Sequence, residues 1–105
     1  IVFMKDYYFA NKEYVDNKTQ LIELYKPFDG TTNNYIPEAI GCKGVTFLIH
    51  DANSNWSTSM SFTRRNTFKI ENNTISITWY GGENKGGYDV SKVDDTYITG
   101  VLIFK

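Results

Sequence analysis

The most regular alternation of apolar and polar residues lies in residues 67–80. Its apolar members are Phe68, Ile70, Ile75, Ile77 and Trp79. A period of two residues is typical of strands with one buried face, and the residues between the two halves, Asn72 and Asn73, tolerate a left-handed backbone. The pattern therefore predicts a β-hairpin. Because a two-stranded ribbon is only marginally stable alone, further strands must cover its apolar face.

Other strands are predicted on both sides of this hairpin. Residues 45–49 form an apolar run with β-branched members, which predicts a strand covered on both faces. The segment around Met60 and Phe62 alternates with those side chains inward, and residues 97–104 predict a strand that holds the C-terminus in a sheet. Residues 21–25 fit either the end of a helix or a first strand, and we favour the strand.

The remaining segments are short. Residues 1–9 suggest an apolar strand or an extended arm, and residues 11–18 favour a helix with an asparagine N-cap. Residues 37–40 predict a single helical turn that begins at a proline and stops at Gly41. The glycine-rich residues 81–87 predict an exposed loop.

Together, about seven short strands separated by turns predict an all-β fold. The expected architecture is an antiparallel β-sandwich, jelly-roll-like, with a short N-terminal helix. Residues 1–24 are expected to form an N-terminal arm and a short helical neck, and residues 25–105 a β-sandwich head.

Composition and charge exclude some classes of partner. The 105 residues suffice for one domain with its own core. The formal net charge of −1, from 11 basic and 12 acidic residues, argues against a nucleic-acid partner. The apolar runs are far shorter than the roughly 20 residues that cross a bilayer, so we expect a soluble chain with no membrane partner. Because the chain begins with Ile1 and not with Met, we expect a processed product or a domain of a longer protein.

No group of residues follows the spacing that an enzyme or a metal site requires. The single cysteine, Cys42, leaves no internal disulfide, and His50 adds too few ligands for zinc. Cys42 is interpreted as a small buried apolar residue, not as a catalytic partner of His50. The residues before Trp56 match the first half of a calcium loop, but Trp56 stands where the loop needs glycine, so an Asx-rich turn is the better interpretation. Asp94 and Asp95 point to opposite sides of a strand end, so we expect no catalytic residue, no metal and no cofactor.

Aromatic residues make up 16% of the chain and include eight tyrosines. In or beside loops such rings stack on the apolar faces of sugars, while Asn, Asp and Arg bond the hydroxyl groups. The candidates for glycan contact are Trp56, Tyr80, Tyr88, Arg64 and Arg65, the two arginines as partners for an anionic phosphate. The alternative is structural, because rings on strands are typical of a core or a subunit interface and paired arginines of a solvated strand end.

Three segments resemble parts of known phage proteins. Residues 10–18, ANKEYVDNK, resemble the NK-x-YVD-x-K helix of tail fibres and receptor-binding proteins of tailed bacteriophages, where it forms a short trimeric neck. Residues 24–49 resemble the small β-sandwich heads that follow such necks in phages of Gram-positive hosts, and residues 98–101 are similar to the way those heads end. The apolar arm, residues 1–9, is not part of the resemblance.

The resemblance implies a homotrimeric tip at the end of a virion tail, or of a phage-tail-like bacteriocin. Such a tip acts extracellularly at the host surface and binds cell-surface polysaccharide or teichoic acid. Two other functions stay open. One is a monomeric carbohydrate-binding module of a cell-wall enzyme, and the other is a trimerisation or assembly domain of a tail protein with no ligand of its own.

Overall fold

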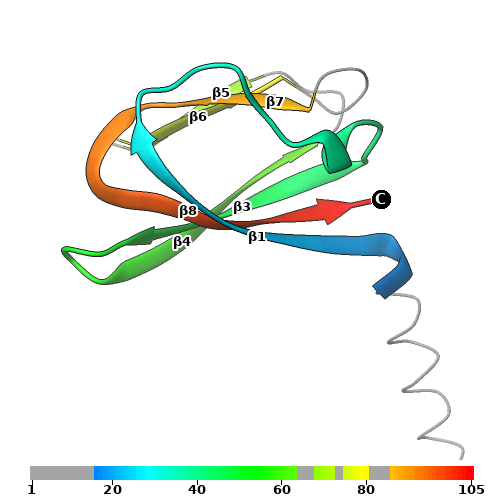
Figure 1. Ribbon diagram of the computed structural model, residues 1–105, viewed down its shortest axis with the longest axis horizontal. Coiled ribbons are helices and arrows are strands. Elements are labelled where there is room, and N and C mark those ends of the chain that lie inside the picture. The colour runs from blue at the N-terminus through cyan, green and yellow to red at the C-terminus, as the bar shows by residue number, and fades with distance from the viewer. Residues whose placement is uncertain (1–15, 64–67, 73–74, 81–85) are drawn as a thin grey trace, which may run out of the picture.

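The computed structural model describes residues 16–63, 75–80 and 86–105 in full, and residues 68–72 by their backbone. It confirms the predicted fold class, because two antiparallel sheets pack as a sandwich behind a short helical segment at residues 16–18 (Figure 1). The elements are β1 (Thr19–Asp29), β2 (Asn34–Tyr35), the 3₁₀ helix η1 (Pro37–Ala39), β3 (Gly44–Asp51), β4 (Trp56–Thr63), β5 (Phe68–Asn72), β6 (Ile75–Trp79), β7 (Gly87–Val90) and β8 (Lys92–Phe104). Two of the described strands, β2 and β7, were not predicted by the sequence pattern.

The strand order explains why the sandwich closes on itself. One four-stranded sheet, called sheet A, has the order β1-β8-β3-β4, and the other, called sheet B, has the order β2-β7-β6-β5. The first strand therefore pairs with the last, and the second with the next to last. This nested pairing is the jelly-roll-like part of the topology. Inside it, β3–β4 and β5–β6 are antiparallel pairs of consecutive strands.

Two locally predicted elements are confirmed. The hairpin is β5 and β6, paired from Phe68 opposite Trp79 to Asn72 opposite Ile75. Asn72, predicted as a turn residue, is instead the last residue of β5, while Asn73 lies outside the described residues. The helical turn is η1, which begins at a proline. Gly41, two residues after its end, has φ +80°, a left-handed conformation that glycine adopts without strain.

The core lies between the inner faces of the two sheets. Alternate residues of the strands fill it, namely Val45, Phe47 and Ile49 of β3, Met60 and Phe62 of β4, Ile75, Ile77 and Trp79 of β6, Tyr88 and Val90 of β7, and Ile98, Val101 and Ile103 of β8. The Phe47 ring contacts both sheets, with centroid distances of 5.7 Å to Phe62 and 6.0 Å to Trp79. Burying each large side chain of this kind stabilises the fold by about 1.5–3 kcal/mol, so the core fixes which face of each strand points inward.

The prediction that residues 45–49 are covered on both faces is wrong. Val45, Phe47 and Ile49 are buried in the core, whereas Thr46 and Leu48 are only half-buried on the opposite face of β3. No described element packs over that outer face of sheet A (Figure 1).

The strand predicted at residues 21–25 is confirmed and extends further at both ends. β1 begins at Thr19, directly after the helical residues 16–18, and Thr19 lies opposite Phe104 in β8. The division into an arm and neck (1–24) and a head (25–105) stays a prediction, but its boundary lies inside β1. Residues 19–24 are part of sheet A, and most of the predicted neck helix and the arm lie outside the described residues.

Candidate functional site

The residues predicted to contact a glycan do not form one site. Tyr88 faces the core and is 3% exposed, so the prediction that its ring meets a sugar is wrong. Burial, together with the negative charge of Asp29, raises the pKa of the Tyr88 phenol, which keeps it neutral. Trp56 opens β4 in sheet A and packs half-buried against the core. Tyr80 follows β6 in sheet B, half-buried, and its hydroxyl donates to the Asp89 carboxylate.

Arg64 and Arg65, the predicted partners of an anionic phosphate, lie outside the described residues. Their assignment therefore stays a prediction. Trp56 and Tyr80 belong to different sheets, so they do not build a shared surface.

Three rings and a serine do come together, on the outer face of sheet A. One residue from each strand forms what we call the tyrosine row: Tyr25 of β1, Tyr97 of β8, His50 of β3 and Ser57 of β4. The Tyr25 and Tyr97 ring centroids are 4.3 Å apart with planes inclined at 33°. The His50 ring meets Tyr97 edge-on at 5.6 Å, and its Nδ1 lies 2.8 Å from the Ser57 hydroxyl oxygen. Tyr97 is thus held between two rings, while Tyr25 at the end of the row is 69% exposed.

Beside the tyrosine pair lies a hollow of about 300 Å³, which we call the tyrosine hollow. Tyr25 and Tyr97 line it together with four charged residues, Asp29, Lys92, Asp94 and Asp95. Aromatic rings next to side chains that accept and donate hydrogen bonds are the combination that binds sugars, because a pyranose has apolar faces and a polar edge.

The hollow exists because β8 bulges at its start. Pro27 pairs with Tyr97 and Asp29 with Lys92, so residues 93–96 of β8 lie opposite the single residue Phe28. The extra residues must leave the plane of the sheet, and Asp95 makes the bend with φ 62°, a left-handed conformation that aspartate tolerates better than most residues. The acidic side chains of the bulge are thereby displayed next to the tyrosines.

The turn between β3 and β4 holds the bulge in place. The Ala52 N–H donates to the Asp95 carbonyl at 2.8 Å. One Asp51 carboxylate oxygen accepts from the Ser54 N–H at 2.7 Å and the other from the Thr96 hydroxyl at 2.8 Å. These bonds, that from Ser54 first, lower the pKa of Asp51, so it is ionised at neutral pH. The Asx-rich turn expected before Trp56 is confirmed, with Asp51 as its acceptor.

Asp29 at the other end of the hollow is also held as an anion. Its carboxylate accepts from the Thr31 N–H at 3.1 Å and lies 3.5 Å from Lys26 Nζ. Hydrogen bonding from Thr31, more than the charge of Lys26, lowers the pKa of this carboxyl. The hollow therefore carries fixed negative charge at neutral pH.

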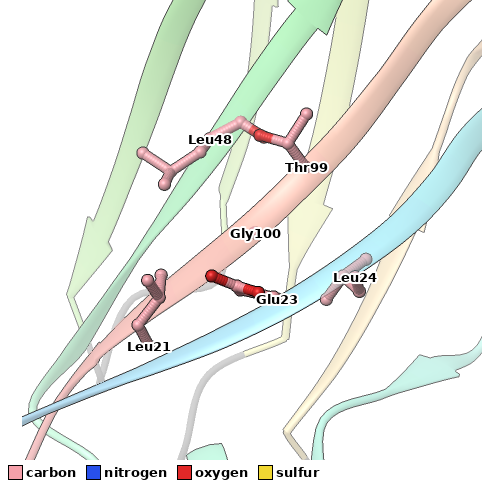
Figure 2. Close-up of a pocket in the computed structure, with 6 residues that line it drawn as sticks. All are labelled: Leu21, Glu23, Leu24, Leu48, Thr99 and Gly100. Atoms are coloured by element: carbon pink, nitrogen blue, oxygen red, sulfur yellow. The ribbon is translucent and has the colours of Figure 1, made fainter.

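A second hollow lies on the same face. The leucine groove, of about 570 Å³, crosses β1, β8 and β3 and is lined by Leu21, Glu23, Leu24, Leu48, Thr99 and Gly100 (Figure 2). A Cβ built at Gly100 would lie 3.5 Å from a Leu21 methyl and 3.6 Å from a Leu48 methyl, so these two side chains flank the glycine. The groove has no aromatic ring, which makes it a weaker candidate for a sugar.

The Cys42–His50 pair considered for catalysis is separated. Cys42 is buried in the core, while His50 lies on the outer face of β3 against Ser57. Within the described residues no group of three His, Cys, Asp or Glu side chains is placed to hold a metal ion. The same residues include no helix long and apolar enough to span a membrane.

The tyrosine row was not predictable from the sequence because its members are far apart in the chain. Tyr25 and Tyr97 become neighbours only through the pairing of β1 with β8. A weak signal was present, since Tyr97 directly precedes Ile98, which is buried, and alternation then places Tyr97 on the outer face.

Comparison with known proteins gives no match: no protein-family model, no curated protein and no solved structure matches this chain. The fold itself defines the class, an antiparallel β-sandwich with an aromatic surface site. The resemblance to phage receptor-binding heads stays a prediction.

Proposed function

We propose that the chain is the receptor-binding tip of a phage tail, or of a phage-tail-like bacteriocin, and that it recognises a host cell-surface glycan without performing chemistry. The observation that carries the proposal is the packed pair of tyrosines, the exposed Tyr25 and the half-buried Tyr97, beside a hollow lined by four charged residues. Apolar surface gathered in one place on a protein often marks an interaction site, so a ring pair with one exposed member beside a hollow favours a binding role.

Rigidity supports the same role. Tyr25 and Tyr97 stand on paired strands of sheet A, and His50 from β3 packs on Tyr97 from the other side. A ring that is already fixed loses little conformational entropy when a ligand stacks on it, so the affinity per contact is higher than for a mobile ring. The rest of the protein acts as the scaffold that displays this face.

The proposal includes the assembly and place of action that the resemblance implies. The protein would be a homotrimer at the tip of a virion tail, acting extracellularly at the host surface, with a cell-surface polysaccharide as its ligand and no cofactor. The helical residues 16–18 directly before β1 are compatible with the end of a neck helix. Light scattering measures the mass in solution, and a monomer at moderate concentration would favour a carbohydrate-binding module of a cell-wall enzyme instead.

The leucine groove favours a second function. Its three leucines, among them Leu21 with 51% exposure, suit contact with protein, as expected for a trimerisation or assembly domain without its own ligand. Binding to purified host wall polymers separates the two functions, because an assembly domain would bind none of them.

The direct test compares two tyrosines. Tyr25 is 69% exposed and Tyr35, on β2 in sheet B, is 67% exposed, so replacing either with alanine should leave the fold intact. We expect Tyr25→Ala to weaken binding to the wall polymer roughly threefold to tenfold, and Tyr35→Ala to leave it unchanged. Equal effects of the two substitutions in isothermal titration calorimetry would contradict the assignment of the site.

A further inference from the structure

The charge of the tyrosine hollow restricts what it can bind. Among the described residues that line it, three carboxylates, Asp29, Asp94 and Asp95, face one cation, Lys92. The Asp29 carboxylate already pairs with Lys26 and accepts a hydrogen bond from the Thr31 N–H. The Asp94 and Asp95 side chains make no hydrogen bond or ion pair within the described part of the chain, so they are free to meet a ligand.

The aromatic wall of the hollow also favours a cation over an anion. The face of an aromatic ring attracts cations, because its π system is electron-rich, and the attraction increases where carboxylates lie nearby. Tyr25 presents such a ring, packed by Tyr97 on one side and otherwise exposed. An anion placed here would meet the carboxylates of Asp94 and Asp95 and an electron-rich ring together, with Lys92 as the one cation among the described residues that line the hollow.

We propose that the tyrosine hollow receives a sugar unit that bears a protonated amine, stacked on Tyr25 and Tyr97 with its ammonium group toward Asp94 and Asp95. This inference rests on the proposed function and selects among its ligands: an amine-bearing glycan binds at this face, and a phosphate-bearing polymer such as teichoic acid is disfavoured. The volume of about 300 Å³ lies at the lower end of ligand pockets, which suits one sugar ring and not an extended segment.

The test uses the full chain and three probes in isothermal titration calorimetry. Glucosamine oligomers carry the amine, N-acetylglucosamine oligomers share the backbone but are neutral, and poly(glycerol phosphate) is anionic. We expect the glucosamine oligomers to bind at least tenfold more tightly than the acetylated ones, with the preference falling as salt is added, and poly(glycerol phosphate) to bind weakest.

Substitutions then locate the preference. In the double variant Asp94→Asn and Asp95→Asn the difference between the two oligomers should disappear, because the amides keep the shape and remove the charge. Asparagine also tolerates the left-handed backbone at position 95, so the bulge should persist. Glu38→Gln, an exposed carboxylate on η1, is the matched control and should leave the preference unchanged.

The outcomes separate this inference from the proposed function. Equal binding of the two oligomers, or tighter binding of poly(glycerol phosphate), would overturn the amine preference while leaving glycan recognition in place. An amine preference that survives the double variant would also overturn it, since the carboxylates would then have no part in it. Failure of all three probes and of the host wall polymer to bind would remove both proposals.

Discussion

Two tyrosines on opposite faces of the sandwich are almost equally exposed, yet their surroundings differ. Tyr25, 69% exposed, stacks on Tyr97 and borders a hollow with unpaired carboxylates. Tyr35, 67% exposed, lies on the two-residue β2 beside Gly87 and contacts no other ring within the described residues. Exposure alone therefore does not identify a binding residue. The proposal rests on the combination at Tyr25 of a packed ring, a hollow and carboxylates in one place.

The largest expected effect is the loss of stability when the core side chain beneath the tyrosine hollow is removed. Phe28 is 2% exposed and is the single β1 residue opposite the bulge. Phe28→Ala removes a core side chain under the hollow and should lower the free energy of unfolding by about 3–5 kcal/mol. Tyr35→Ala should change it by less than about 0.5 kcal/mol. Urea denaturation measures both, and a loss below about 1 kcal/mol for Phe28→Ala would show that the bulge does not depend on the core.

A smaller effect concerns the ring pair itself. The stacking of Tyr25 on Tyr97 should appear as a coupling of about 0.5–1.5 kcal/mol in a double-mutant cycle with Tyr25→Leu and Tyr97→Leu. The matched cycle with Tyr25→Leu and Tyr35→Leu should show coupling near zero, because these residues are on different sheets. Similar coupling in both cycles would mean that Tyr25 is no more fixed than Tyr35.

The smallest expected effect is on acid stability. The pKa values of Asp51 and Asp29 are lowered from their ordinary value of 3.8, so both carboxylates favour the folded state above that pH. This contribution is lost as pH falls below 3.8 through the folded-state values. Hydrogen exchange should therefore show the Ala52 and Ser54 amides, which hold the bulge and its turn, losing protection in acid before the amides of β6. Asp51→Asn should reduce this dependence, and uniform loss of protection across both sheets would contradict the account.

Which parts of the fold the sequence predicts depends on how far apart along the chain the interacting residues lie. The β5–β6 hairpin was predictable because Ile75, Ile77 and Trp79 alternate within a few residues and the alternation decides which face is buried. Tyr88 was misassigned because it follows a glycine-rich stretch, yet its place in β7 opposite Trp79 turns it inward. The local composition around Tyr88 predicts an exposed side chain, whereas the register of β7 against β6 buries it.

The candidate site could not be predicted from the sequence, because its residues are also far apart along the chain. Its rings come from β1 and β8, and its carboxylates are displayed by a bulge that depends on the left-handed backbone of Asp95. Nothing in the residues around Asp94 and Asp95 indicates such a bend, since aspartate pairs are common at ordinary strand ends. Long-range register and a single unusual backbone angle thus create the surface that the alternation pattern could not show.

The most direct test of the central claim, that the outer face of sheet A binds a glycan at the tyrosine pair, is a chemical-shift titration of the isotope-labelled chain with purified host wall polysaccharide. The account predicts that the perturbed amides cluster at Tyr25, Asp94, Asp95 and Tyr97, while Tyr35 and its neighbours on β2 and β7 stay unchanged. Perturbations centred on Tyr35, or none at any polymer concentration, would contradict it.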